Sequence, residues 1–180
     1  MALLCCVLAA CGSRPVGPLH GMQLAPSQPA AGFTLTDQEA KLFRFDSTRG
    51  QAVALYFGFT HCKDVCPQTL ALLAKARSRA RLSPQQVRIV MVTVDPAHDT
   101  PAALRAFFKK LRVNATGLTG KPAALRAVYK AYGIAVEPRR RDILHTDTIF
   151  LIGPRGRIIE TLVPQSSLED IAADLRRVVE

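Results

Sequence analysis

The chain has 180 residues, 48% of them hydrophobic, so it is long enough for one globular domain with a sizeable core. Its 24 Lys and Arg residues against 14 Asp and Glu residues give a formal net charge of +10, which suits an anionic lipid surface or an acidic partner. Because no nucleic-acid-binding motif accompanies this charge, we expect no nucleic acid partner.

The first residues resemble the signal of a bacterial lipoprotein. Residues 1–10 are almost wholly apolar, and Leu8-Ala9-Ala10 precede Cys11 as in a lipobox. The resemblance implies that residues 1–10 are removed and that Cys11 carries the lipid, on the periplasmic side of a bacterial membrane. The usual Lys or Arg before the apolar run is absent, so a chance cysteine after a hydrophobic N-terminus is the alternative.

Residues 11–32 are rich in Pro, Gly, Ser and Ala and show no periodicity, which predicts a flexible tether. No stretch of about 20 apolar residues occurs after residue 10, so we expect no transmembrane helix there. The remaining residues, 33–180, are predicted to form one domain.

Strand and helix patterns alternate along that domain. The expected elements are a hairpin over 33–45, buried strands over 52–59 and 87–94, helices over 67–81, 102–111 and 123–132, a hairpin over 148–162, and a C-terminal helix opened by the capping box Ser166–Glu169. This order predicts an α/β fold, with a mixed central sheet, helices on both faces and an N-terminal β-hairpin. It is the order of the thioredoxin-like fold.

Two cysteines lie where the strand over 52–59 meets the next helix. Pro67 suits the first helical turn, which places Cys66 at or near the N-cap. Backbone N–H groups and the helix dipole favour a thiolate there, so we expect an unusually low pKa for Cys66. Together with Cys62, it can cycle between dithiol and disulfide or bind a soft metal such as Cu(I). A structural disulfide is a further possibility, although closing so short a loop gains roughly 2 kcal/mol or less.

An ordered set of motifs resembles the Sco/SenC family of copper-binding, thioredoxin-like proteins that help to assemble the copper site of cytochrome c oxidase. The set comprises Phe57–Pro67, Thr93–Pro96, Asp99–Pro101, Gly117–Gly120, Ala131–Gly133, and His145 before Ile149–Gly156.

The resemblance implies that Cys62, Cys66 and His145 bind one copper ion per chain. It also implies, as partner, the copper-site subunit of cytochrome c oxidase or another copper chaperone. Two thiolates and one imidazole suit Cu(I), whereas structural zinc usually takes four protein ligands. Leu144 stands where the family commonly has Asp before the histidine, and Asp147 follows two residues after it.

The alternative function is a thiol-disulfide oxidoreductase acting through Cys62 and Cys66, so enzymatic activity is left open. Thioredoxin-like reductases resemble one another in a C-x-x-C motif and in a proline just before the next strand. Here three residues separate the cysteines, and residues 144–147 contain no proline.

Several other residues are secondary candidates at the same site. His61, Asp64 and Asp95 could supplement or tune it, but surface and capping roles fit them equally well. His20 and His98 receive no assignment. The basic residues of Pro138–Asp142 are interpreted either as a docking surface or as a solvated loop.

Overall fold

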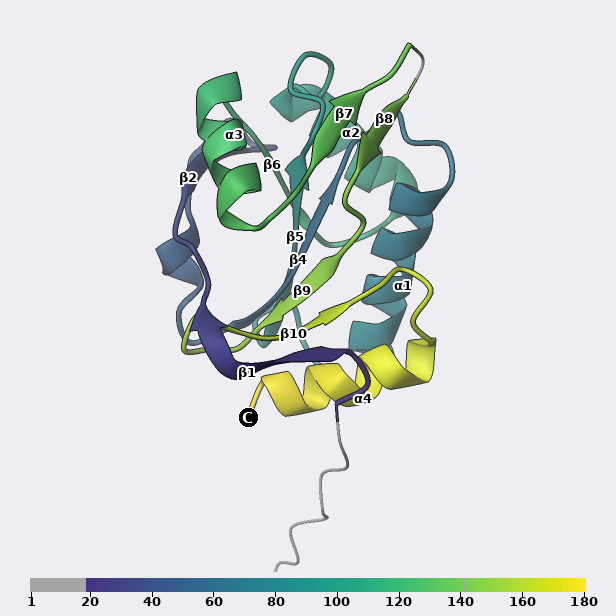
Figure 1. The fold of residues 1–180 in the computed structure, drawn as a ribbon. Helices are drawn as coiled ribbons and strands as arrows, with labels where there is room; N and C mark the ends of the chain where they lie inside the picture. Colours follow the sequence, from purple (N-terminus) through teal and green to yellow (C-terminus); the bar gives the residue numbers. More distant parts are fainter. Residues whose placement is uncertain (1–18, 141) are drawn as a thin grey trace, which may run out of the picture.

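The computed structural model describes residues 19–140 and 142–180, which form a mixed eight-stranded sheet with helices on both faces (Figure 1). The strand order is β1-β10-β9-β4-β5-β6-β2-β3. These strands are β1 (Met22–Pro29), β2 (Thr34–Asp37), β3 (Leu42–Arg44), β4 (Ala52–Gly58), β5 (Val87–Thr93), β6 (Thr116–Thr119), β9 (Ile149–Ile152) and β10 (Arg157–Leu162). The helices are η1 (Phe45–Thr48, 3-10), α1 (Val65–Arg79), α2 (Pro101–Leu111), α3 (Pro122–Ala131) and α4 (Leu168–Val178).

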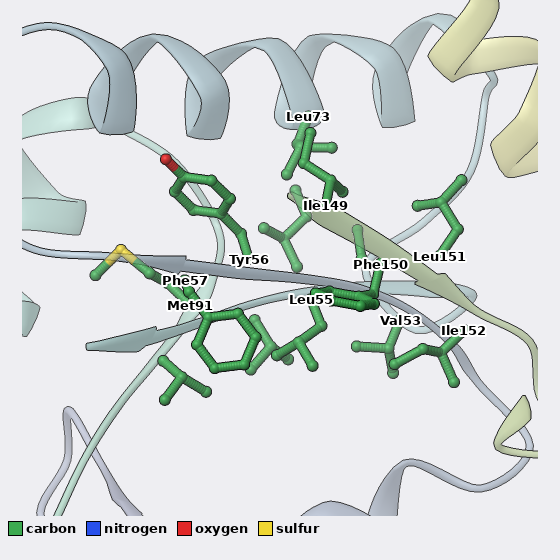
Figure 2. Packing of buried hydrophobic residues seen from close by; sticks show 14 of the residues in the cluster. Val53, Leu55, Tyr56, Phe57, Leu73, Met91, Ile149, Phe150, Leu151 and Ile152 are labelled. Atoms are coloured by element: carbon green, nitrogen blue, oxygen red, sulfur yellow. The ribbon is translucent and has the colours of Figure 1, made fainter. Parts of the chain in front are cut away.

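Strand β4 forms the centre of the sheet. It pairs in parallel with β5 and antiparallel with β9, and all seven of its residues are buried. Side chains alternate across a strand, and Figure 2 shows Tyr56 pointing toward Leu73 of α1 while Phe57 points to the opposite face. The continuous apolar run is therefore explained by cover on both faces.

The helices divide unequally between the two faces. Right-handed crossovers from β4 to β5 and from β5 to β6 place α1 and α2 on the same face, and α4 packs against α1. Gly117 in β6 lets α2 approach, because a Cβ there would overlap the ring of Phe108. Helix α3 covers the other face, where Tyr129 and Tyr132 pack with ring centroids 6.2 and 5.7 Å from that of Phe57.

The predicted tether is wrong for residues 22–29, which form strand β1 at the edge of the sheet. Met22 pairs with Thr161 of β10, and Pro29 pairs with Arg157. Gln, Ser and Pro residues gave this segment no alternating apolar pattern, so only its pairing with β10 identifies it as a strand. Residues 1–10 and Cys11 lie outside the described residues. Among the described helices, none is both long and apolar enough to cross a membrane.

Two helix starts differ from their predicted positions. Ser167, not Ser166, caps α4, and its hydroxyl accepts a hydrogen bond of 3.1 Å from the N–H of Asp170. Helix α1 begins at Val65 with Asp64 as N-cap, so Cys66 lies inside the first turn rather than at the cap. The predicted N-terminal hairpin is confirmed as β2 and β3, with β2 also pairing with β6.

The sequence interpretation missed a third, smaller hairpin, which lies outside the main sheet. Strands β7 (Val136–Pro138) and β8 (Ile143–His145) form a separate antiparallel pair in which Val136 lies opposite His145. The pairing continues through Thr146, whose N–H donates to the carbonyl of Ala135 at 3.0 Å. His145 therefore ends a strand, whereas the sequence placed it in a loop.

Candidate metal centre

Both candidate thiols lie where β4 ends and α1 begins. Cys66 is completely buried, whereas Cys62 is half-buried, and both are free thiols. The N–H of Cys66 donates a hydrogen bond to Sγ of Cys62 at 3.3 Å. This contact holds the loop in a tight turn, with one sulfur reachable from solvent and the other enclosed.

The space for the buried sulfur depends on Gly58. A Cβ on Gly58 would lie 2.8 Å from Cε1 of Tyr56 and 3.2 Å from Sγ of Cys66. These contacts are closer than ordinary van der Waals separations. The last residue of β4 therefore lacks a side chain where Tyr56 and Cys66 meet.

The expected low pKa of Cys66 is wrong. Burial, followed by the neighbouring Cys62 thiol, raises the pKa of Cys66 to about 12. The helix N-terminus favours the thiolate, but removing the sulfur from water disfavours the charge more strongly. A bound cation reverses this balance, because metal binding releases the thiol proton.

Strand β8, which ends at His145, lies at the same end of the molecule as the start of α1 (Figure 1). The ring of His145 packs edge-on against Tyr56 and Phe59, with centroids 6.5 and 6.1 Å apart. Nδ1 of His145 lies 3.0 Å from the carbonyl oxygen of Thr146 and must donate to it, which leaves the lone pair of the neutral ring on Nε2. The ring is therefore oriented as a metal-binding histidine commonly is.

The three predicted ligands share one end of the fold without forming a closed site. In residues 19–140 and 142–180, the only group of three or more His, Cys, Asp and Glu side chains with ligand atoms within 4.8 Å of one another is His61, Asp95 and Asp99. An ion shared by both thiols and His145 would require these three side chains to move closer together.

A buried carboxylate that the sequence interpretation overlooked organises the approach to the thiols. Asp99 accepts hydrogen bonds of 2.6 Å from the hydroxyls of Thr60 and Thr93, and the Thr60 N–H lies 3.1 Å from it. Burial raises the pKa of Asp99, while these hydrogen bonds oppose the rise. The carboxylate thereby ties the loop after β4 to the end of β5. In the sequence, the one signal for this role was the presence of an aspartate, Asp99, in the motif just before helix α2.

The secondary candidates separate clearly in space. His61 and His98 are exposed neighbours, with ring centroids 5.4 Å apart. Asp64 is exposed and forms no side-chain cap hydrogen bond. His20 lies before β1, where its Nδ1 is 2.9 Å from Oδ1 of Asp174 in α4, so it belongs to a different part of the fold.

A protein-family model described as SCO1/SenC matches residues 22–180. The chain belongs to the Sco/SenC family. Among its relatives, the protein SCO2 homolog of Bos taurus mitochondria is 31% identical over 153 residues. The match covers 81% of this chain and 58% of the cattle protein, so the chain spans less than two thirds of that relative.

Two solved structures of Sco/SenC proteins are similar to this chain. ScoI from Bradyrhizobium japonicum, with copper bound, is 31% identical, has a TM-score of 0.74, and the match covers 83% of this chain and 98% of that one. A SCO1/SenC family lipoprotein from Bacillus anthracis str. Ames is 28% identical, has a TM-score of 0.75, and the match covers 85% and 96%. The predicted family and the thioredoxin-like α/β fold are confirmed.

Proposed function

We propose that this Sco/SenC protein is a membrane-tethered copper carrier that binds one Cu(I) ion through Cys62, Cys66 and His145. The observation that carries the proposal is the pair of cysteines that follows β4, joined by a hydrogen bond from the N–H of Cys66 to Sγ of Cys62. One thiol is enclosed and one is half-buried, and Nε2 of His145 is free at the same end of the fold. The copper-bound ScoI relative supports the choice of metal.

The donor set suits a soft ion that has to be passed on. Thiolates select Cu(I), and hard cations such as Ca²⁺ and Mg²⁺ prefer oxygen ligands. Enclosed Cys66 keeps one donor away from water, whereas half-buried Cys62 is accessible to a partner's ligand. A site of this kind retains the ion and still permits transfer by ligand exchange.

The proposed recipient is the copper-site subunit of cytochrome c oxidase or another copper chaperone. A similar Sco protein is described as a member of a family of cytochrome c oxidase assembly proteins. The proposed anchor is lipid on Cys11, on the periplasmic side of a bacterial membrane. The lipobox-like residues and the lipoprotein among the relatives support this anchor.

Cu(I) binding by the reduced full chain tests the ligand set. In competition with a chromophoric Cu(I) chelator, the parent is expected to bind one ion, and Cys66→Ser to weaken binding roughly 100-fold or more, because one of two thiolates is lost. His145→Ala is expected to weaken it by about tenfold or more. His20→Ala, which removes another half-exposed histidine, is the matched control and keeps full affinity. Full affinity in Cys66→Ser would overturn the proposal.

A thiol-disulfide oxidoreductase is the second candidate, favoured by the close approach of the Cys66 N–H to Sγ of Cys62. A disulfide between these cysteines consumes both sulfur donors, so oxidised protein is expected to lose copper and to regain it after reduction. Disulfide-reduction assays are expected to show little turnover. Brisk turnover that is unchanged in His145→Ala, without a stable copper complex, would favour the enzyme instead.

A further inference from the structure

Arginines gather at the end of the sheet opposite to the thiols. At that end, Val53 of β4 pairs with Arg88 of β5 and with Ile152 of β9. Ile152 pairs in turn with Ile158 of β10, so the starts of β4, β5 and β10 meet there. The thiols follow Gly58, the last residue of β4. The residues of this strand span roughly 20 Å, which separates the two ends.

The segments that meet around the β9–β10 turn form an arginine-rich surface, the basic end. Its members are Arg49, Arg88, Arg155, Arg157, Arg176 and Arg177. The guanidinium of Arg49 donates to the carbonyl of Arg155, which ties the segment before β4 to the turn. In that same segment, Oε1 of Gln51 accepts a hydrogen bond of 2.8 Å from Nε of Arg88. These contacts hold side chains from three strands on one surface.

The last turn of α4 adds Arg176 and Arg177 to this surface. Arg155, Arg157 and Arg177 line one cavity of about 180 Å³, whose wall also includes the middle of β1. Nε of Arg157 donates to Oγ of Ser27 in β1 at 2.9 Å, which fixes its guanidinium group there. Arginine binds phosphate groups through paired hydrogen bonds, so three guanidinium groups around one cavity suit an anion of this kind.

Most of this positive charge has no acidic partner within the protein. Among the described residues, Arg177 is the one member of the basic end that forms an ion pair, at 3.8 Å from Oδ1 of Asp174. Beneath the surface, buried Arg77 donates to the carbonyls of Val87 and Asn114, at 3.1 and 3.2 Å. Its charge is therefore held by neutral backbone groups and adds to the positive potential of this end.

Two side-chain carboxylates oppose this charge. Asp46 is exposed in η1, just before Arg49, and Glu180 lines the cavity with the arginines. The turns that lead into β5 and β6 add exposed Arg81 and Arg112 at the same end, because β4, β5 and β6 are parallel. The balance at this end is therefore positive.

The end that carries the thiols has a more mixed charge. Lys63 in the loop after β4 is followed by Asp64. In the β7–β8 hairpin, Arg139 lies 3.9 Å from Glu137, and Asp142 lines a cavity with it. Basic side chains there have acidic neighbours, so a negatively charged surface distinguishes the two ends of the domain.

The basic end also lacks large apolar side chains on its surface. In residues 19–140 and 142–180, the large hydrophobic residues that are exposed are Met22, Leu42, Val65, Leu144 and Val163. None of them belongs to residues 45–51, 153–157 or 176–180. Protein interfaces usually have an apolar core inside a polar rim, whereas a layer of lipid headgroups attracts basic side chains by charge. The composition of this surface therefore favours headgroups over a protein partner.

We propose that the basic end docks on the anionic headgroups of a phospholipid membrane. Attraction to such a surface acts over about one Debye length, about 8 Å at physiological salt, so the end that faces the lipid is held and the far end is not. The thiols then lie on the side of the domain away from the lipid. This orientation goes beyond the proposed copper delivery and leaves the sulfur donors accessible to a partner.

The start of the described chain supports lipid as the occupant. Nδ1 of His20 lies 2.9 Å from Asp174 of α4, the carboxylate that also pairs with Arg177. The lipid proposed on Cys11 would be nine residues earlier (20 minus 11), at most about 32 Å of extended chain. The basic end would then be within reach of the membrane. This support rests on the proposed anchor, whereas the charge of the basic end does not.

Binding to vesicles of defined charge tests the proposal. The full chain with Cys11→Ser, which cannot carry the lipid, is mixed with vesicles of phosphatidylcholine alone or of phosphatidylcholine and phosphatidylglycerol in equal parts. Co-sedimentation measures the bound protein. We expect binding to the anionic vesicles and not to the neutral ones. We also expect this binding to be lost at about 1 M salt, where the Debye length is about 3 Å.

Two double variants with the same change of net charge separate the two ends. Arg155→Gln with Arg176→Gln removes two exposed charges of the basic end. It is expected to weaken vesicle binding roughly 20-fold, since each arginine near an anionic surface contributes roughly fivefold. Arg139→Gln with Arg140→Gln, at exposed positions in the β7–β8 turn, is the matched control and keeps the parent's affinity. Equal weakening by both pairs would show that net charge alone matters and would overturn the proposal.

Hydrogen exchange of the vesicle-bound protein measures the orientation. Anionic vesicles are expected to slow exchange in residues 46–51 and 153–157 and to leave residues 59–64 unchanged. Protection confined to residues 59–64, absence of binding, or equal binding to neutral vesicles would overturn the proposal. Binding to heparin without binding to anionic vesicles would assign the basic end to another anionic partner and would also overturn it. These assays use neither copper nor a lipid on Cys11, so the proposed copper carrier and its anchor can fail separately.

Discussion

At the scale of single residues, the thiol pair depends on groups that do not themselves bind metal. Gly58 leaves space for Cys66 and Tyr56, and Asp99 holds the loop that leads to Cys62. The hydroxyl of Tyr56 also donates to Asp147 at 3.0 Å, which ties the enclosed end of β4 to the segment after His145. The geometry of the candidate site is thus set largely by its neighbours.

Gly58→Ala is expected to destabilise the protein by about 1–3 kcal/mol, because its Cβ would overlap Tyr56 and crowd the Cys66 sulfur. The free energy of unfolding from urea titration measures this effect. Gly32→Ala is the control, because its Cβ would lie 3.4 Å from its nearest neighbour, an oxygen of Asp46, which is an ordinary van der Waals contact. Equal stability of Gly58→Ala and the parent would contradict the crowding.

At the scale of elements, the edge strand β1 is attached through a pair of buried carboxyl groups. The N–H of Gly21 donates to Oε2 of Glu160 in β10 at 3.0 Å, and His20 bonds to Asp174 in α4. The groups facing Glu160 and Asp174 are His20, Asp170 and Arg177. Burial and the neighbouring Asp174 raise the pKa of Glu160 from 4.5 to about 7.

This raised pKa predicts a direction for the pH dependence of stability. Folded protein holds the Glu160 proton more tightly than the unfolded chain, so the contribution of this group falls as pH rises from about 4.5 to about 7. The raised pKa of His20 acts in the same direction. Glu160→Gln replaces the titrating carboxyl group with a neutral amide. Between pH 5 and pH 8 the variant is therefore expected to lose less melting temperature than the parent, and each kcal/mol of stability corresponds to roughly 2–4 °C.

Thermal melts at both pH values measure this effect. Glu169→Gln, at an exposed position in the first turn of α4, is the control and is expected to keep the parent's pH dependence. An unchanged pH dependence in Glu160→Gln would show that the buried pair does not control the attachment of β1.

At the scale of the whole molecule, the turn between β4 and α1, which contains Cys62, lies at one end of the described domain, and the start of β1 lies at the opposite end (Figure 1). The described chain therefore enters the domain, at His20 and β1, far from the cysteines that we propose as copper ligands. The basic turn with Arg139 and Arg140 lines a cavity together with His61, the residue before Cys62, and its charge suits an acidic partner.

Cys11→Ser tests the anchor. We expect the variant to remain unprocessed or to leave the membrane fraction, because the sulfur that accepts the lipid is lost. Cell fractionation with detection of the protein measures this, and Cys5→Ser and Cys6→Ser serve as controls that change little. Processing and membrane binding like the parent's would contradict the lipoprotein prediction.

Most of the fold could be predicted from the sequence because its signals are local. Buried strands β4 and β5 are continuous apolar runs, and helices α2 and α4 have recognisable starts. The neighbouring cysteines could be placed for the same reason, since a strand end and a helix start are defined within a few residues. Strand β1 could not, because its identity depends on pairing with β10.

The sequence by itself determined the family, the order of the main elements and the position of both thiols at the end of β4. Only the tertiary structure decided how Cys66 titrates, because burial outweighs the helix dipole there. It also decided the role of Asp99, whose partner Thr60 lies 39 residues away, and the gathering of His61 with Asp95 and His98. Such contacts arise from chain segments that meet only when the sheet has formed, so no local pattern records them.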